Sequence, residues 1–75
     1  MKVLQTLRES RGWSRSELAR RAHMHPVTVG VIESGRLVPY PGQLAKLARA
    51  LSLPAERAHR LIEEAAADGD ATRGA

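Results

Sequence analysis

The sequence contains no cysteine and no phenylalanine, and its aromatic residues are one Trp and one Tyr. Without cysteine the chain has no disulfide bond and no thiolate ligand for a metal. With only Trp13 and Tyr40 it has little material on which single-stranded bases could stack. No apolar run approaches the roughly 20 residues that span a bilayer. The segment Met1–Thr6 lacks the apolar core of a signal peptide, so we expect a cytoplasmic protein with no membrane partner.

Acidic residues are also few over most of the chain. Lys and Arg number 12 against eight Asp and Glu, which gives a net charge of +4 over the 75 residues. Residues 1–62 carry 11 basic and four acidic side chains, whereas residues 63–75 carry one basic and four acidic side chains. A basic body indicates a polyanionic partner, most simply nucleic acid. The alternative is an Arg-rich helical protein whose charge only keeps it in solution.

Capping residues and apolar spacing predict helices and no strand. Ser14 followed by Glu17 is typical of a capping box, in which each side chain accepts from the other residue's backbone N–H. Pro26, Pro41 and Pro54 suit the first position of three later helices, since proline lacks the N–H that is unpaired there. We therefore predict one all-α domain of five helices over residues 1–67, followed by a disordered acidic tail over residues 68–75.

Two short helices joined by a turn, within a basic helical body, are the components of a helix-turn-helix. The order of residues resembles the phage-repressor (Xre/Cro-type) class over about residues 2–62. The positions that carry the resemblance are Gly12 to Ala19, Ala22, Val29, Ile32, Glu33, Gly35, Pro39 and Leu44 to Leu51. The resemblance implies a lambda-repressor-like fold and a small bacterial or phage transcription regulator at the nucleoid. Its third helix is expected to enter the major groove of double-stranded DNA.

The resemblance also implies roles for individual residues. It implies an ion pair between Arg8 and Glu33 that ties the first helix to the third. The residues implied in contacts to the DNA backbone are Arg15, Thr28, Ser34 and Arg36, and we expect Arg11 to assist them. Those expected to face the bases are His25, Val27, Thr28 and Val31.

The sequence departs from the family pattern on the third helix. The base-reading positions correspond to Pro26, Val27, Gly30 and Val31, and none of these side chains can form a hydrogen bond. Valine can still contact a thymine methyl group, so one hypothesis is a DNA reader that relies on phosphate contacts, methyl contacts and DNA shape. The other is a protein-binding adaptor that uses the apolar third helix and the following loop, with a transcription component or a toxin as partner. His23 also departs, because the family usually has a glycine of positive φ there.

Apolar residues near the fourth and fifth helices favour a homodimer. The residues expected at its interface are Leu37, Val38, Tyr40, Leu61 and Ile62. Exposed apolar clusters of this kind often mark an interface. The alternative is that they fold under and cover the core of the domain.

The remaining candidates for chemistry have simpler structural explanations. His23, His25 and His59 lack the further ligands that a zinc site needs, and His25 can instead cap the third helix. Trp13 and Met24 are expected to pack on the core. The isolated glycines form no phosphate-binding loop. Taken together, these residues lead us to expect no enzyme activity, no cofactor and no metal.

Overall fold

The computed structural model describes residues 1–54, 56–61, 63 and 64, and within these ranges the chain is helical with no strand. The helices are α1 (Lys2–Ser10), α2 (Arg15–Arg21), α3 (Pro26–Glu33) and α4 (Pro41–Ala50). A fifth helical segment includes residues 56–61, 63 and 64. The predicted all-α, five-helix fold is confirmed. The predicted tail, residues 68–75, and Ile62 lie outside the described residues.

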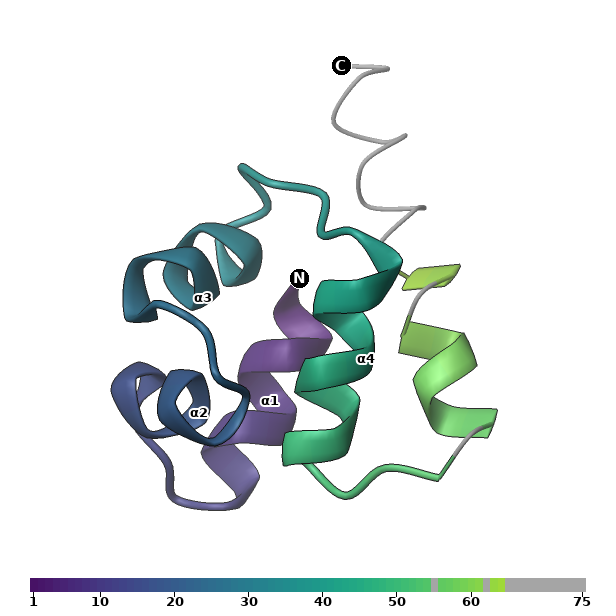
Figure 1. The fold of residues 1–75 in the computed structure, drawn as a ribbon, viewed down its shortest axis with the longest axis horizontal. Helices are drawn as coiled ribbons and strands as arrows, with labels where there is room; N and C mark the ends of the chain where they lie inside the picture. The colour runs from purple at the N-terminus through teal and green to yellow at the C-terminus, as the bar shows by residue number, and fades with distance from the viewer. Residues whose placement is uncertain (55, 62, 65–75) are drawn as a thin grey trace.

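Helix α1 lies at the centre, with α2 and α3 on one side of it and α4 and the fifth segment on the other (Figure 1). The helices α2 and α3 pack closely on each other, and each also contacts another helix, α4 and α1 respectively. This arrangement leaves the outer face of α3 uncovered by the other described elements (Figure 1).

Each of these four helices is followed, two positions after its last residue, by a residue in the left-handed backbone region. These residues are Gly12, His23, Gly35 and Ser52, with φ of +69°, +56°, +82° and +55°. After α2, for example, the N–H of Met24 reaches back to the carbonyl of Ala19 at 2.8 Å, which closes a Schellman turn. His23 thus adopts the positive φ of the glycine that the resemblance leads one to expect there, although a Cβ disfavours this conformation.

Side chains cap the starts of α2, α3 and α4. The backbone N–H of Glu17 donates to Ser14 Oγ at 3.0 Å, and the N–H of Tyr40 donates to Gln43 Oε1 at 2.9 Å. The second hydrogen bond of the predicted capping box, from the backbone N–H of Ser14 to the Glu17 side chain, is wrong. In the described part of the chain the Glu17 carboxylate accepts from Arg20 and Arg21 instead, because two cationic donors offer stronger bonds than one backbone N–H.

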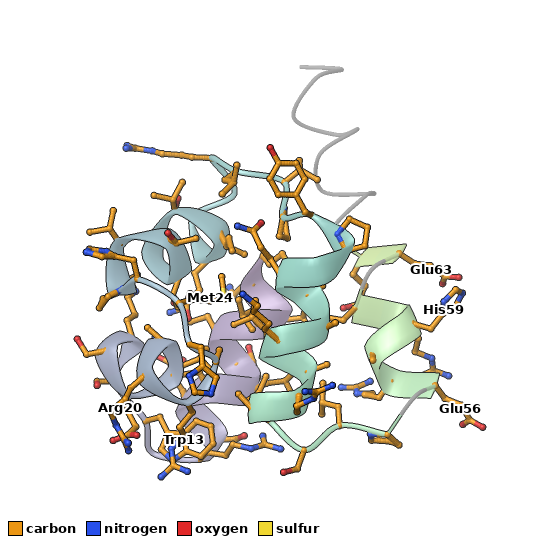
Figure 2. The ribbon with its side chains drawn as sticks, viewed as in Figure 1. Trp13, Arg20, Met24, Glu56, His59 and Glu63 are labelled. Atoms are coloured by element: carbon orange, nitrogen blue, oxygen red, sulfur yellow. The ribbon has the colours of Figure 1, made fainter. Side chains whose placement is uncertain are left out.

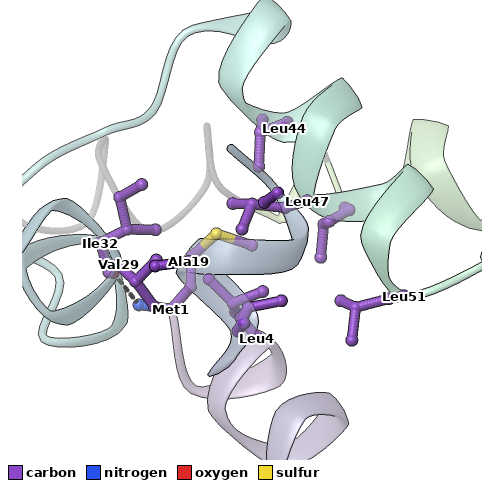
Figure 3. Packing of buried hydrophobic residues seen from close by; sticks show 11 residues of the cluster. Met1, Leu4, Ala19, Val29, Ile32, Leu44, Leu47 and Leu51 are labelled. Carbon is purple, nitrogen blue, oxygen red and sulfur yellow. Dashed lines mark hydrogen bonds between the residues drawn. The ribbon is translucent and has the colours of Figure 1, made fainter. Parts of the chain in front are cut away.

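The core lies where α1 to α4 and the fifth segment meet. Its fully buried large side chains are Leu4, Leu18, Val29, Ile32, Leu44, Leu47 and Leu51 (Figure 3). Trp13 and Met24 are partly buried and pack against this cluster, as predicted. Figure 2 shows Met24 between the α2–α3 pair and α4. Within the described residues, no helix is both long and apolar enough to cross a membrane.

Candidate nucleic-acid interface

A shallow hollow lies on the surface between the start of α2 and α3. It has a volume of about 500 Å³ and is lined by Arg15, Ser16, Pro26, Val27, Gly30, Val31, Ser34 and Arg36. Two arginines and no carboxylate are among these residues, so the hollow favours an anionic ligand. The floor is apolar, and Val27 is 64% exposed. The hollow brings together many of the residues that sequence reasoning assigned to DNA contacts, from both helices.

A buried glutamate lies behind this hollow. Arg8 Nε donates to Glu33 Oε2 at 2.7 Å, and Arg8 Nη2 donates to Glu33 Oε1 at 3.2 Å. The Glu33 side chain is 1% exposed and that of Arg8 is 10% exposed. The hydrogen bond to Glu33 raises the pKa of Arg8 further above its ordinary value, although burial acts against this. The ion pair implied by the resemblance therefore lies within the fold and joins α1 to α3.

Glu33 also binds a second arginine that sequence reasoning did not connect to it. Arg15 Nε donates to Glu33 Oε1 at 3.2 Å, and the Arg15 side chain is 55% exposed. The Arg15 side chain crosses the face of α3 at Gly30. A Cβ placed on Gly30 would lie 3.8 Å from both Cδ and Nη1 of Arg15. One end of the hollow is thus an arginine whose position is set by a buried carboxylate.

The start of α3 is fixed by a histidine. His25 Nδ1 accepts from the backbone N–H of Val27 at 3.1 Å, which caps the start of the helix. His25 is not among the residues that line the hollow, and neither is Thr28, which is half-buried on α3. Base contacts by these two residues stay predictions. Sequence reasoning did not select Ser16, which lines the hollow one position after Arg15.

Arg11 lies apart from the hollow. Its guanidinium donates to the carbonyl of Leu7 at 3.1 Å and to the carbonyl of Leu51 at 2.6 Å, and it lies 5.9 Å from the centre of the Trp13 ring. These contacts join the ends of α1 and α4. The guanidinium of Arg11 thus bonds two carbonyls of its own fold, and Arg11 is not among the residues that line the hollow.

Part of the predicted dimer interface belongs to the core. Leu61 is 2% exposed and packs in the core cluster, so its assignment to an exposed interface is wrong. Leu37 is half-buried against the same cluster, as in the alternative in which these residues cover the core. A domain this small has few apolar side chains with which to build a core, so these two contribute to it. Val38 and Tyr40 stay exposed.

A second basic groove, which sequence reasoning missed, lies between α2 and α4. It has a volume of about 290 Å³ and is lined by Arg21, Ala22, His23, Ala45, Lys46, Arg49 and Ala50. Its basic side chains come from separate helices, so only the packing of α2 on α4 brings them together. It shares no lining residue with the hollow on α3.

Arg21 in this groove is already engaged. Its Nε donates to Glu17 Oε2 at 2.9 Å, and its guanidinium lies 4.3 Å from the centre of the Trp13 ring. Arg20 donates to the same carboxylate oxygen. Partial burial acts to raise the pKa of Glu17, but the bonds and charges of Arg20 and Arg21 outweigh it and lower that pKa below its ordinary value. Figure 2 shows Trp13 and Arg20 at the same end of the molecule.

The histidines do not form one group in the described part of the chain. His59 Nε2 lies 3.2 Å from Glu63 Oε1 on the fifth segment, where both side chains point outward (Figure 2). His25 is used as a helix cap, and no group of three His, Cys, Asp or Glu residues within the described ranges could hold a metal ion.

Comparison with known proteins agrees with this geometry. The family model of the helix-turn-helix domain matches residues 2–61. The chain belongs to the helix-turn-helix domain family. In this family member α2 and α3 are the paired helices, and the recognised resemblance is confirmed.

The chain is similar to the multiprotein-bridging factor 1 of the fission yeast Schizosaccharomyces pombe. It is 35% identical over 51 residues, which cover 68% of this chain and 34% of the relative. The helix-turn-helix chain thus spans about a third of the length of that protein. No solved structure matches the helix-turn-helix chain itself.

Proposed function

We propose that this helix-turn-helix chain is a small transcription regulator that binds duplex DNA through the hollow on α3. The observation that supports this most is the composition of the hollow, in which Arg15 and Arg36 border an exposed helix face and no carboxylate is present. In the helix-turn-helix arrangement the second helix of the pair enters the major groove. Here that helix is α3, the one whose outer face is uncovered.

Charge in the hollow supplies the affinity. Arg15 and Arg36 are exposed, and Ser34 is exposed directly after the end of α3. Each phosphate that they neutralise releases condensed counterions, which makes binding favourable and dependent on salt. Val27 and Val31 then contact the groove surface and offer their methyl groups to thymine. This arrangement gives firm backbone binding with modest discrimination among bases.

Fluorescence anisotropy with a labelled duplex of random sequence tests the proposal. We expect affinity to fall steeply between about 50 mM and about 200 mM salt, with a log–log slope of about −0.9 for each phosphate neutralised. The Arg15→Ala/Arg36→Ala double variant should weaken binding and make the slope shallower by about one unit for each phosphate contact that it removes. Lys46→Ala/Arg49→Ala is the matched control, because it removes two charges from the groove between α2 and α4. Equal losses in both double variants would show that only overall charge matters and would contradict the proposed site.

A second candidate function is a protein-binding adaptor, and two observations favour it. Val27, Val38 and Tyr40 are large apolar residues that stay exposed on α3 and the loop after it. The fission yeast relative is named a bridging factor. Under this hypothesis Val27→Asp would abolish capture of a partner protein, while the random duplex would not bind the wild type at any salt concentration.

Homodimerisation is proposed through Val38 and Tyr40, the two predicted interface residues that are exposed in the described part of the chain. A symmetric dimer would hold two α3 helices about 34 Å apart, one turn of the duplex. Sedimentation at tens of micromolar should show a dimer that Tyr40→Glu dissociates. A wild-type monomer under these conditions would contradict the proposed dimer.

A further inference from the structure

The face of α3 that lines the hollow lacks any side chain that can read a base by hydrogen bonding. Its members Pro26, Val27, Gly30 and Val31 are apolar or have no side chain. Guanine and adenine are told apart in the major groove through hydrogen bonds to their edges, above all by paired donors or acceptors on one side chain. A reader of this kind must therefore come from outside this face of α3.

Arg15 reaches this face from α2. Its Cδ and Nη1 lie close enough to Gly30 that an added Cβ would be in ordinary contact with both, at 3.8 Å. No side chain at position 30 occupies the space above the helix, so the arginine lies across it. Gly30 costs α3 about 1 kcal/mol relative to alanine. A methyl group there would be in ordinary contact with Arg15, whereas a larger side chain would enter the space that the arginine crosses.

The direction of the Arg15 guanidinium is fixed by Glu33. The hydrogen bond to Glu33 Oε1 uses Nε, at 3.2 Å, and leaves the two Nη groups for a ligand. Glu33 itself is held by Arg8 through two hydrogen bonds and is almost fully buried. A guanidinium held through its Nε loses less rotamer freedom when it binds than a free one does.

We propose that Arg15 is the base reader of this protein, and that it recognises a guanine edge in place of the missing polar side chains of α3. The inference rests on the proposed binding of DNA through this hollow. The fork of two Nη groups matches guanine O6 and N7, which is the commonest specific contact of arginine with DNA. Glu33 is the positioning residue, and Gly30 provides the space.

The neighbouring carboxylate supports reading over simple anchoring. Glu33 lies within 3.2 Å of Arg15, so its negative charge partly offsets the attraction of Arg15 for a phosphate. The same bond orients the two Nη groups of Arg15, and this orientation matters for paired hydrogen bonds to a base edge. Arg36, which is exposed in the loop after α3, is better suited to backbone anchoring.

Selection from duplexes with a randomised central segment tests the inference, using the full chain and three variants. Arg15→Lys keeps the charge but removes the fork. Gly30→Leu keeps Arg15 but fills the space that its side chain crosses. Arg36→Lys is the matched control for a change of arginine to lysine. Thermal unfolding of each variant shows whether it is folded before its DNA preference is measured.

We expect the wild type to enrich guanine at one position of the bound site, and Arg15→Lys and Gly30→Leu to reduce that preference roughly tenfold. Arg36→Lys should keep it. If Arg15→Lys weakens all sequences equally, or if the guanine preference survives in both variants, the inference is overturned while the proposed function stands. If the wild type binds no duplex even at low salt, the proposed function fails, and the reader with it.

Discussion

Two glutamates in this helix-turn-helix domain are each shared by two arginines, yet they lie in very different surroundings. Glu33 at the end of α3 binds Arg8 and Arg15, and its side chain is 1% exposed. Glu17 in α2 binds Arg20 and Arg21, and its side chain is 32% exposed. Both clusters contain the same ionic groups. They differ in how far they are buried and in which helices they connect.

The comparison teaches that burial gives one cluster a tertiary role that the other lacks. The Glu33 cluster joins α1, α2 and α3, because its partners are 25 and 18 residues away along the chain. The Glu17 cluster lies within α2, with partners at i+3 and i+4. Water screens the charges of the Glu17 cluster, whereas it screens the buried Arg8–Glu33 pair of the other cluster much less. Only the Glu33 cluster connects the core to the candidate DNA-binding hollow.

The largest expected effect is that of Glu33→Gln. The substitution leaves Arg8 buried without its counter-charge, which should lower the free energy of unfolding by about 3 kcal/mol. Chemical denaturation measures this, with Glu17→Gln as the matched control. If the two substitutions had equal effects, the contrast between the clusters would be lost.

A paired substitution separates the value of the ion pair from the cost of breaking it. Replacing both buried partners with apolar residues of similar size, in Arg8→Met/Glu33→Met, removes both charges at once. Because no unpaired charge is left inside, we expect the double variant to recover at least half of the roughly 3 kcal/mol lost by Glu33→Gln. Recovery of none of it would mean that the pair stabilises the fold beyond satisfying its own charges. Denaturation curves measured side by side would decide this.

Gly30→Ala tests the space that the Glu33 cluster uses on α3. The added Cβ would be in ordinary contact with Arg15, so no strain opposes the gain in helix propensity. We expect unfolding to become harder by about 0.5–1 kcal/mol. The matched control is Gly35→Ala, which should destabilise, because Gly35 has φ of +82°. Destabilisation by Gly30→Ala would show that Arg15 cannot tolerate even a methyl group there.

The smallest effect is expected for Glu17, and it depends on pH. The pKa of Glu17 is lowered by Arg20 and Arg21, so the folded state holds the ionised form more firmly than the unfolded state does. Its contribution to stability is present above the unfolded pKa and is lost as pH falls through the lowered folded pKa. Thermal melts of wild type and Glu17→Gln should differ slightly near neutral pH and converge in acid. Divergence in acid would contradict this sign.

The sequence predicts the helices well because local signals govern their ends. Ser14 and the prolines mark helix starts, and the ends lie next to residues of left-handed conformation, two of which are glycines. Leu61 was harder to place, because an apolar residue on a helix face looks the same in a core and in a dimer interface. Its burial depends on how the fifth segment packs on the others.

Contacts between residues far apart in the sequence account for the features that could not be predicted from it. Arg11 reaches a carbonyl 40 residues away at the end of α4, which no local pattern reveals. The bond between Arg15 and Glu33 depends on how α2 packs on α3 and on the absence of a large side chain at position 30. The resemblance identified the candidate DNA-binding residues, but not which of them share a buried carboxylate.

Nuclear magnetic resonance with the isotope-labelled protein tests the central claim most directly, because it locates the bound duplex on the fold. On addition of a short duplex at low salt, the amide signals of Arg15, Ser16, Val27, Gly30, Val31 and Arg36 should shift most, and added salt should reverse the shifts. Shifts confined to the groove formed by Arg21, His23, Lys46 and Arg49, or no shifts at all, would contradict the claim that DNA binds in the hollow on α3.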